Sequence, residues 1–231
     1  MRLLLASALA LLAARASAAG GYYDKGYRTG KWDIGLHPGW AIPISKTSDV
    51  MGTSWAMTFN GGYQFADAAT VGIDWGWQFK HKVHGTARPG GEYAADYDGD
   101  GSVDVVPFNS TIHYVIMNLT PFIKVGPWLE GFGYHWRPYG VAGAGFYHEW
   151  TNSGTVDIQG NDRVSGNPVG PVIFRRDTSS NSYLGVNVGT GFEVQVDENA
   201  DVGFDLRYTR IFRPIYDWDF ITPSIRVLYL F

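Results

Sequence analysis

The chain has 231 residues, of which 17% are charged and 16% are aromatic, and 30 are glycine. This combination excludes an intrinsically disordered chain, because disorder requires few aromatic residues and a high charge. Lys and Arg number 18 against 22 Asp and Glu, so the net charge of -4 gives no support for nucleic-acid binding. The sequence contains no cysteine, and its stability therefore cannot depend on disulfides.

The N-terminus, MRLLLASALALLAARASA, has the three parts of a secretory signal peptide. Arg2 supplies the positive region, residues 3–14 form the apolar core, and a small-residue cleavage site ends at Ala18. The apolar core is too short to span a bilayer as a helix. We therefore expect residues 1–18 to be a cleaved signal peptide and residues 19–29 to be a periplasmic N-terminal segment.

Beyond residue 29, apolar and polar residues alternate with a period of two, which is typical of strands with two unlike faces. In TVGIDWGWQFK, residues 70–80, every odd-numbered position is apolar, whereas the even-numbered positions are Thr, Gly, Asp, Gln and Lys. Seven further segments share the pattern, although the start of 111–125 and the facing of 138–150 are ambiguous. We predict eight strands, over residues 31–42, 54–65, 70–80, 111–125, 138–150, 182–196, 201–209 and 220–231.

The predicted connections alternate in length along the chain. Residues 66–69 and 197–200 are short turns, whereas 83–110 and 152–181 are long, polar loops. Short turns on one side and longer loops on the other are typical of outer-membrane β-barrels. We predict an eight-stranded antiparallel up-and-down transmembrane β-barrel over residues 30–231. Ten strands remain an alternative if the loop at 152–181 contains a hairpin.

The alternation alone does not say which face points outward, because a soluble lipocalin-like barrel also has eight strands. Two features favour a membrane barrel. Aromatic residues recur near the strand ends, as in the girdles at the two bilayer interfaces. The last strand also ends in Phe231, with Tyr229 two residues before it. Tyr229 and Phe231 are similar to the C-terminal signal that outer-membrane insertion machinery recognises, and we expect them to serve as that signal.

The segment PYGVAGAGFYHEW, preceded by NLTPFIKV, resembles the central hairpin of the small outer-membrane β-barrel superfamily. This superfamily includes OmpW-like, OmpX-like and OmpA-domain proteins of the "porin family". The resemblance implies a location in the bacterial outer membrane, in contact with lipid and lipopolysaccharide. For OmpW-like members it also implies passage of small molecules, apolar ones among them.

The polar face of the predicted strands carries charges that would point into the barrel. An eight-stranded barrel is just wide enough to be filled by its own side chains, so buried charges there must pair. We expect a salt-bridged plug, with a gated ion path as the alternative. The predicted lumen charge network comprises Asp33, Asp74, Lys80, Lys124, Glu193, Asp205, Arg207 and Arg226.

The connection after the third predicted strand combines basic and acidic residues. Lys80, Lys82 and Arg88 lie where that strand leaves the membrane, and they are candidates for contact with lipopolysaccharide phosphates. DYDGDGSVD follows, with Asp96, Asp98, Asp100, Ser102 and Asp104 at the first, third, fifth, seventh and ninth positions of a calcium loop. The twelfth position is Pro107 and the flanks are not helical, which excludes a calcium sensor of the helix–loop–helix type. A calcium site and a solvated Asp/Gly-rich turn both remain open, and no other cofactor is expected.

The sequence therefore predicts an outer-membrane barrel with a structural role or with passage of small molecules. We expect no enzymatic activity, because the chain has no H-x-S arrangement and no G-x-S-x-G motif, although His–Ser pairs distant in the sequence stay open. The alternatives are a lipid A-modifying outer-membrane enzyme and a soluble lipocalin-like carrier.

Overall fold

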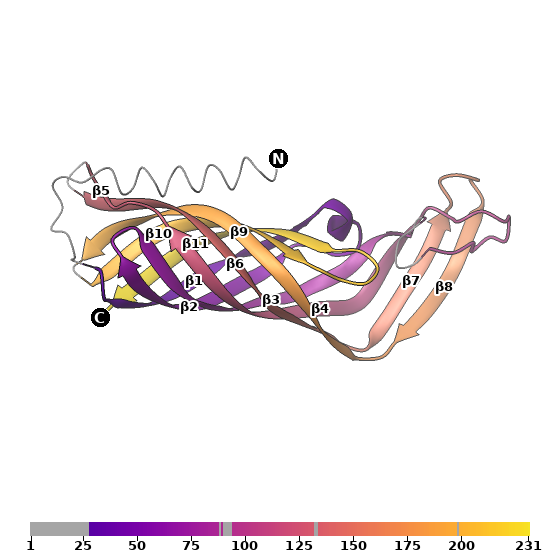
Figure 1. The fold of residues 1–231 in the computed structure, drawn as a ribbon. Helices are drawn as coiled ribbons and strands as arrows, with labels where there is room; N and C mark the ends of the chain where they lie inside the picture. Colours follow the sequence, from indigo (N-terminus) through magenta and orange to yellow (C-terminus); the bar gives the residue numbers. More distant parts are fainter. Residues whose placement is uncertain (1–27, 88, 90–93, 132–133, 198) are drawn as a thin grey trace.

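The computed structural model describes residues 28–87, 89, 94–131, 134–197 and 199–231 (Figure 1). The predicted signal peptide, residues 1–18, lies outside the described residues, and so does most of segment 19–29. No helix among the described residues has the length and apolar character needed to cross a membrane. In chain order the elements are β1 (Trp32–Ile44), the 3-10 helix η1 (Ser45–Asp49), β2 (Ser54–Ala66), β3 (Ala69–Ala87), β4 (Val106–Val125), β5 (Leu129–Gly131), β6 (Tyr134–Thr151), β7 (Gly154–Asn161), β8 (Pro168–Arg176), β9 (Ser179–Asp197), β10 (Ala200–Ile211) and β11 (Trp218–Leu230).

Eight of these strands form a closed antiparallel ring, in the order β1-β2-β3-β4-β6-β9-β10-β11. The pairing of β4 with β6 and of β11 with β1 closes it. All eight predicted segments lie in strands of this ring, so the predicted barrel is confirmed. Closure pairs both edges of every strand, which a sheet in lipid requires because lipid offers no hydrogen-bond partner.

The two ends of the barrel differ. The end that carries Trp32, Phe231 and the short turns is called here the terminal end, and the end that carries η1 and the β3–β4 connection the loop end. The segment 152–181, predicted as a loop, contains the hairpin β7–β8, which projects beyond the ring at the loop end (Figure 1). β7 pairs with the start of β4, with Phe108 opposite Ile158, so the hairpin prolongs the sheet without entering the ring. The ten-stranded alternative is therefore wrong.

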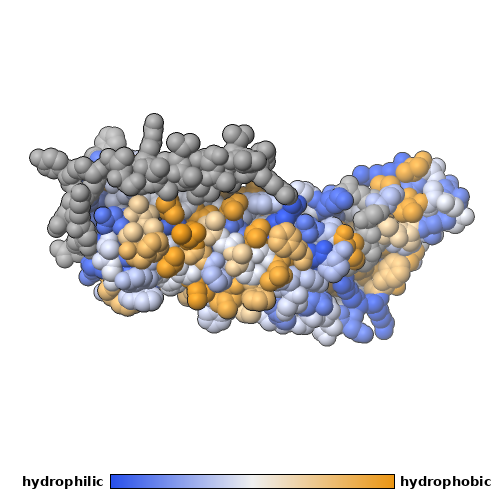
Figure 2. Space-filling view, in the orientation of Figure 1, coloured by the Kyte–Doolittle hydropathy of each residue, from blue (hydrophilic) through white to orange (hydrophobic). Residues whose placement is uncertain are grey.

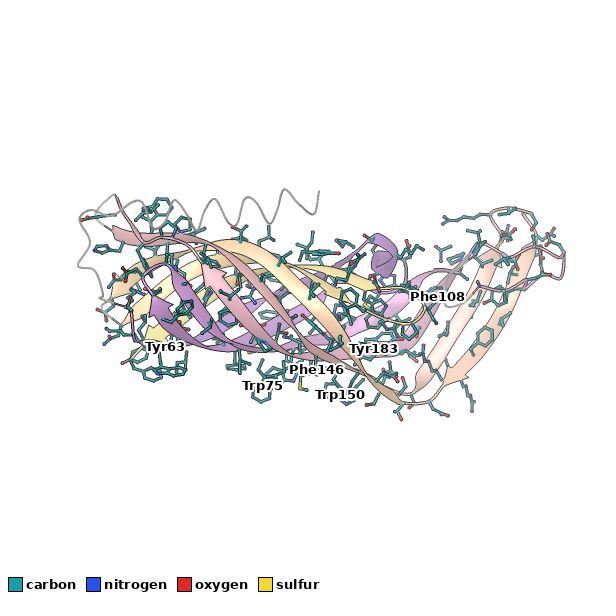
Figure 3. The ribbon with its side chains drawn as sticks, viewed as in Figure 1. Tyr63, Trp75, Phe108, Phe146, Trp150 and Tyr183 are labelled. Carbon is teal, nitrogen blue, oxygen red and sulfur yellow. The ribbon has the colours of Figure 1, made fainter. Side chains whose placement is uncertain are left out.

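In the half nearer the terminal end, the apolar face of each strand points outward. Ile34, Ile73, Leu119 and Phe192 are all about half exposed, whereas the alternate positions are buried. Figure 2 shows apolar residues spread over this outer surface, and Trp75 and Phe146 point away from the barrel wall in Figure 3. A soluble lipocalin-like carrier predicts the opposite arrangement, with an apolar interior and a polar exterior.

Nearer the loop end, the polarity reverses along β4. At the start of β4, Phe108, Ile112 and Tyr114 are buried inside, whereas Asn109 and Thr111 are exposed outside. The three buried residues belong to an apolar cluster that also includes Val83, Ile116, Tyr147, Ile158, Ile211, Trp218 and Phe220. The ambiguous alternation at the start of segment 111–125 is explained by this change, because the buried face becomes apolar there.

A β-bulge in β3 corrects one prediction. Lys80 has a left-handed backbone with a φ of 56°, and the register with β4 shifts between Gln78 and His81. The extra residue makes Phe79 and Lys80 both exposed and turns His81 inward. Lys80 therefore does not belong to the lumen charge network, because strict alternation fails at a bulge.

Candidate functional site

The lumen of the terminal half is occupied by a cluster centred on Glu193 of β9. Lys124 Nζ of β4 lies 2.5 Å from Glu193 Oε1, and Arg226 Nη1 of β11 lies 3.2 Å from the same oxygen. β4 and β11 are on opposite sides of the eight-stranded ring, so these contacts cross the whole bore. All three side chains are at most 1% exposed, and the cluster is therefore a buried network of paired charges.

A second set of ion pairs crosses the middle of the barrel. Arg207 of β10 forms an ion pair with Asp74 of β3, the strand opposite it in the ring. The Nε atom of Arg207 also lies 2.9 Å from Asp205 Oδ2. Because each carboxylate here is almost fully buried, the arginine serves both of them and neither charge is left alone.

A chain of polar contacts joins β1 and β2 to the second set. Asn60 Nδ2 donates to Asp33 Oδ1 at 3.0 Å, and Asn60 Oδ1 lies 2.9 Å from His37 Nε2. His37 Nδ1 in turn lies 3.7 Å from Asp205 Oδ2. The structure thus places seven of the eight predicted lumen charges inside the barrel, divided between these two sets, with Lys80 as the exception.

Between the two sets of charges and the apolar cluster lies a cavity of about 40 Å³, lined by residues that include Asp74, Asn187 and Arg207. Each of these three residues has a buried polar atom without a hydrogen-bond partner among the described residues. A polar cavity of this size holds one or a few water molecules. It is too small for an organic solute.

The inward glycines do not open a channel. A Cβ atom built on Gly35 would lie 2.1 Å from Asn60 Oδ1, and one on Gly76 would lie 2.4 Å from Asn118 Oδ1. A Cβ on Gly191 would similarly meet the Tyr139 hydroxyl at 2.5 Å. The space that these glycines leave is occupied by polar side chains of neighbouring strands, which is why small residues are needed there.

Arg137 is a lumen residue that the sequence analysis missed. It is 1% exposed, its Nε donates to the Gly126 carbonyl at 2.9 Å, and Nη1 lies 3.9 Å from Glu193 Oε2. The predicted strand begins at residue 138, whereas β6 begins at Tyr134. Extending the alternation of Tyr139 and Val141 back by two positions would have found it.

The acidic loop brings three of the five predicted calcium ligands together. One carboxylate oxygen each of Asp96, Asp98 and Asp104 lies within 4.8 Å of the other two. Asp100 lies outside this group, and its Oδ1 accepts hydrogen bonds from the Ser102 backbone amide and hydroxyl. The loop can turn this tightly because Gly99 and Gly101 have φ values of 81° and 90°, a region that glycine adopts without strain.

The remaining predicted residues lie at the two ends of the barrel. Lys80 and Lys82 are exposed on the outer side of β3 near the loop end, and Arg88 lies outside the described residues. Tyr229 and Phe231 are more than half exposed at the terminal end, where the Trp32 and Phe231 backbones exchange two hydrogen bonds.

A His–Ser arrangement that no local motif indicated lies on the outer surface of β6 and β9. His148 Nδ1 is 2.7 Å from Ser182 Oγ, and His148 Nε2 is 2.9 Å from Ser180 Oγ. The two serines are exposed, and the ring of Trp150 contacts His148 at 4.3 Å between centroids. Antiparallel pairing of β6 with β9 brings these distant residues together, with His148 directly opposite Ser182.

Among solved structures, the chain is similar to Neisserial surface protein A, at 14% identity, 88% coverage of this chain, 98% coverage of that chain and a TM-score of 0.53. It is also similar to the N-terminal β-barrel domain of Pseudomonas aeruginosa OprF, at 12% identity, the same coverages and a TM-score of 0.44. The outer membrane protease OmpT of Escherichia coli matches at 11% identity, 91% and 99% coverage, and a TM-score of 0.34. At these identities, the similarity to Neisserial surface protein A indicates a shared fold and nothing about activity.

No curated protein sequence matches this chain significantly. The family model described as "Outer membrane protein beta-barrel domain" matches residues 3–231, which is nearly the whole chain. The closed ring and its apolar outer face agree with that match. The chain therefore belongs to the outer membrane protein beta-barrel domain family.

Proposed function

We propose that this protein is a non-conducting, non-enzymatic structural barrel of the bacterial outer membrane, which holds the β7–β8 extension at the cell surface. The observation that carries this proposal is that side-chain contacts cross the bore at three levels between strands on opposite sides of the ring. Glu193 links β4 to β11, Arg207 links β10 to β3, and the rings of Tyr114 and Trp218 meet at 4.8 Å between β4 and β11. A solute that moves along the bore would have to displace these side chains.

Conductance in planar bilayers tests this proposal. The folded protein, identified by its heat-dependent shift in gel mobility, is expected to give no discrete openings, whereas a general porin inserted in the same bilayer gives them. Proteoliposomes are likewise expected to take up small polar and apolar solutes no faster than empty liposomes. Discrete openings or faster uptake would overturn the structural assignment in favour of passage of small molecules.

The location and partners belong to the same proposal. Cell fractionation is expected to find the chain in the outer membrane, cleaved after Ala18. Tyr229 and Phe231 are proposed to be read by the insertion machinery, which their exposure at the end of β11 supports. Lys80 and Lys82 are proposed to contact lipopolysaccharide phosphates, because they are exposed where the outer surface changes from apolar to polar.

A second candidate function, hydrolysis of acyl esters of outer-membrane lipid, is favoured by the contacts of His148. A serine nucleophile needs a base within hydrogen-bond reach, and His148 can serve as that base for Ser182. However, the other nitrogen of His148 contacts the neutral Ser180, where hydrolase triads place a carboxylate. Mass spectrometry of lipid A from cells that express the wild type or Ser182→Ala decides: altered lipid A only with the wild type supports the enzyme, and identical lipid A excludes it.

A further inference from the structure

We infer that Asp96, Asp98 and Asp104 form a calcium site that fastens the β3–β4 connection to the tip of the β7–β8 hairpin. The first support is the size of the cluster. Calcium binds oxygen ligands at about 2.3–2.6 Å, so two ligands on one ion are at most about 5 Å apart. The three carboxylate oxygens meet this condition, since all lie within 4.8 Å of one another.

The second support is an unsatisfied oxygen on a fully buried side chain. Asp104 is 0% exposed, and its Oδ2 accepts hydrogen bonds from the backbone amides of Tyr97 and Asp98. Its Oδ1 is buried and has no hydrogen-bond partner among the described residues. An ionised carboxylate with an unpaired buried oxygen is unfavourable, and a divalent cation shared with Asp96 and Asp98 satisfies it.

The chemistry of the ligands selects the ion. Three carboxylates in a flexible loop suit Ca²⁺, which accepts six to eight oxygens in varied geometry, whereas Mg²⁺ requires a near-ideal octahedron at about 2.0–2.1 Å. Two Mg²⁺ ligands therefore lie at most about 4.2 Å apart. Backbone carbonyls and water complete the shell of such a site. Extracellular modules of this kind bind Ca²⁺ with a Kd of about 10⁻⁴–10⁻³ M, and we expect this range here.

The site lies at a junction between two segments far apart in the sequence. Ser165 Oγ, from the turn between β7 and β8, donates to Asp98 Oδ2 at 3.0 Å. The Val105 amide donates to Asp162 Oδ1 at 2.6 Å, and the Arg163 amide donates to the Val105 carbonyl at 3.2 Å. An ion that fixes Asp98 therefore also fixes the hairpin tip, which is exposed to solvent on the side away from the barrel.

Calorimetric titration of the folded, lipopolysaccharide-free protein in a zwitterionic detergent with CaCl2 alone tests the inference. Asp104→Asn is the most specific variant, because the amide keeps one oxygen for the Tyr97 and Asp98 amides and replaces the other. It and Asp98→Asn are expected to weaken Ca²⁺ binding at least about tenfold, with an unchanged heat-dependent gel shift. Asp177→Asn removes the same charge from an exposed loop position outside the cluster and is expected to change the Kd less than about twofold.

Proteolysis provides a readout of the junction itself. Calcium is expected to slow cleavage within 94–105 and 161–167 in the wild type and in Asp177→Asn, but not in Asp104→Asn. The absence of saturable binding in the wild type would overturn the inference, and so would an equal loss of affinity in Asp177→Asn and Asp104→Asn. Saturable binding with calcium-independent cleavage at 161–167 would refute the fastening of the hairpin.

Discussion

In the terminal half of the barrel, charged side chains fill the lumen and apolar side chains cover the outside, whereas in the loop half an apolar cluster fills the lumen and polar residues such as Asn109 and Thr111 of β4 face outward. The change occurs within single strands, as β4 shows between Tyr114 and Leu119. The terminal half follows the rule for a sheet surrounded by lipid, and the loop half follows the rule for a sheet surrounded by water. We therefore expect the barrel to leave the bilayer at the level where the polarity changes.

The largest expected effect comes from breaking the charged half. Glu193→Gln removes the carboxylate shared by Lys124, Arg226 and Arg137, which leaves buried cations without their partner. We expect the free energy of unfolding to fall by about 3–5 kcal/mol. Urea titration of the protein refolded in lipid vesicles measures it. Asp197→Asn, an exposed carboxylate at the end of the same strand, serves as the control and should change stability by less than about 0.5 kcal/mol.

The apolar half is tested by creating a cavity in it. Ile112 is fully buried, so Ile112→Ala is expected to lower the free energy of unfolding by about 2–5 kcal/mol. Ile215→Ala, at a position that is 73% exposed, should have little effect in the same titration. Equal stabilities of the two variants would show that the loop half contributes no packing energy and would contradict the proposed division.

The boundary between the halves is located by adding one charge to the outer face of β4 at two heights. Leu119→Arg places a guanidinium where we expect the lipid, and it should destabilise the folded barrel by about 2–4 kcal/mol. Asn109→Arg makes the same addition ten residues earlier on the same face, where we expect water, and should cost about 0–1 kcal/mol. Folding in vesicles at graded urea concentrations compares them. A reversed order would place the bilayer around the loop half.

The smallest effect concerns the contact between the two loop segments. Hydrogen bonds from the Ser165 and Val105 amides lower the pKa of Asp162 to about 2. Because the folded-state pKa is below that of an unfolded Asp, about 3.9, the contact is fully stabilised above that value and weakens as pH falls through about 2. Pepsin cleavage at 94–105, normalised to an unfolded substrate, should therefore be faster at pH 2 than at pH 4. In Asp162→Ala the difference between the two rates should be smaller.

Alternation revealed the eight strands because lipid contact imposes one apolar face on each of them. The same alternation correctly predicted that seven charged residues point into the barrel. The prediction for Lys80 is wrong because a bulge shifts the inward–outward alternation by one residue. No residue in the segment FKHKV indicates this bulge. Arg137 was missed because the outer face of β6 is built from Gly140, Ala142 and Ala144, which give no apolar contrast. The hairpin β7–β8 was left only as an alternative for a different reason. The exposed end of β7 carries polar residues that are also typical of loops, and the adjacent Ile173 and Phe174 of β8 are both exposed, which breaks the alternation.

The seam between β1 and β11 also constrains how the barrel is made. Trp32 and Phe231 pair across it, although nearly the whole chain separates them in sequence. Contacts of such long sequence separation form slowly, because the entropy of closing a long loop is lost before the contact forms. Until β11 has paired with β1, every partially assembled sheet has two open edges that lipid cannot satisfy and that other chains can pair with. No edge in the ring is left open once this seam has formed, and we expect assembly to need protection of the open edges until then.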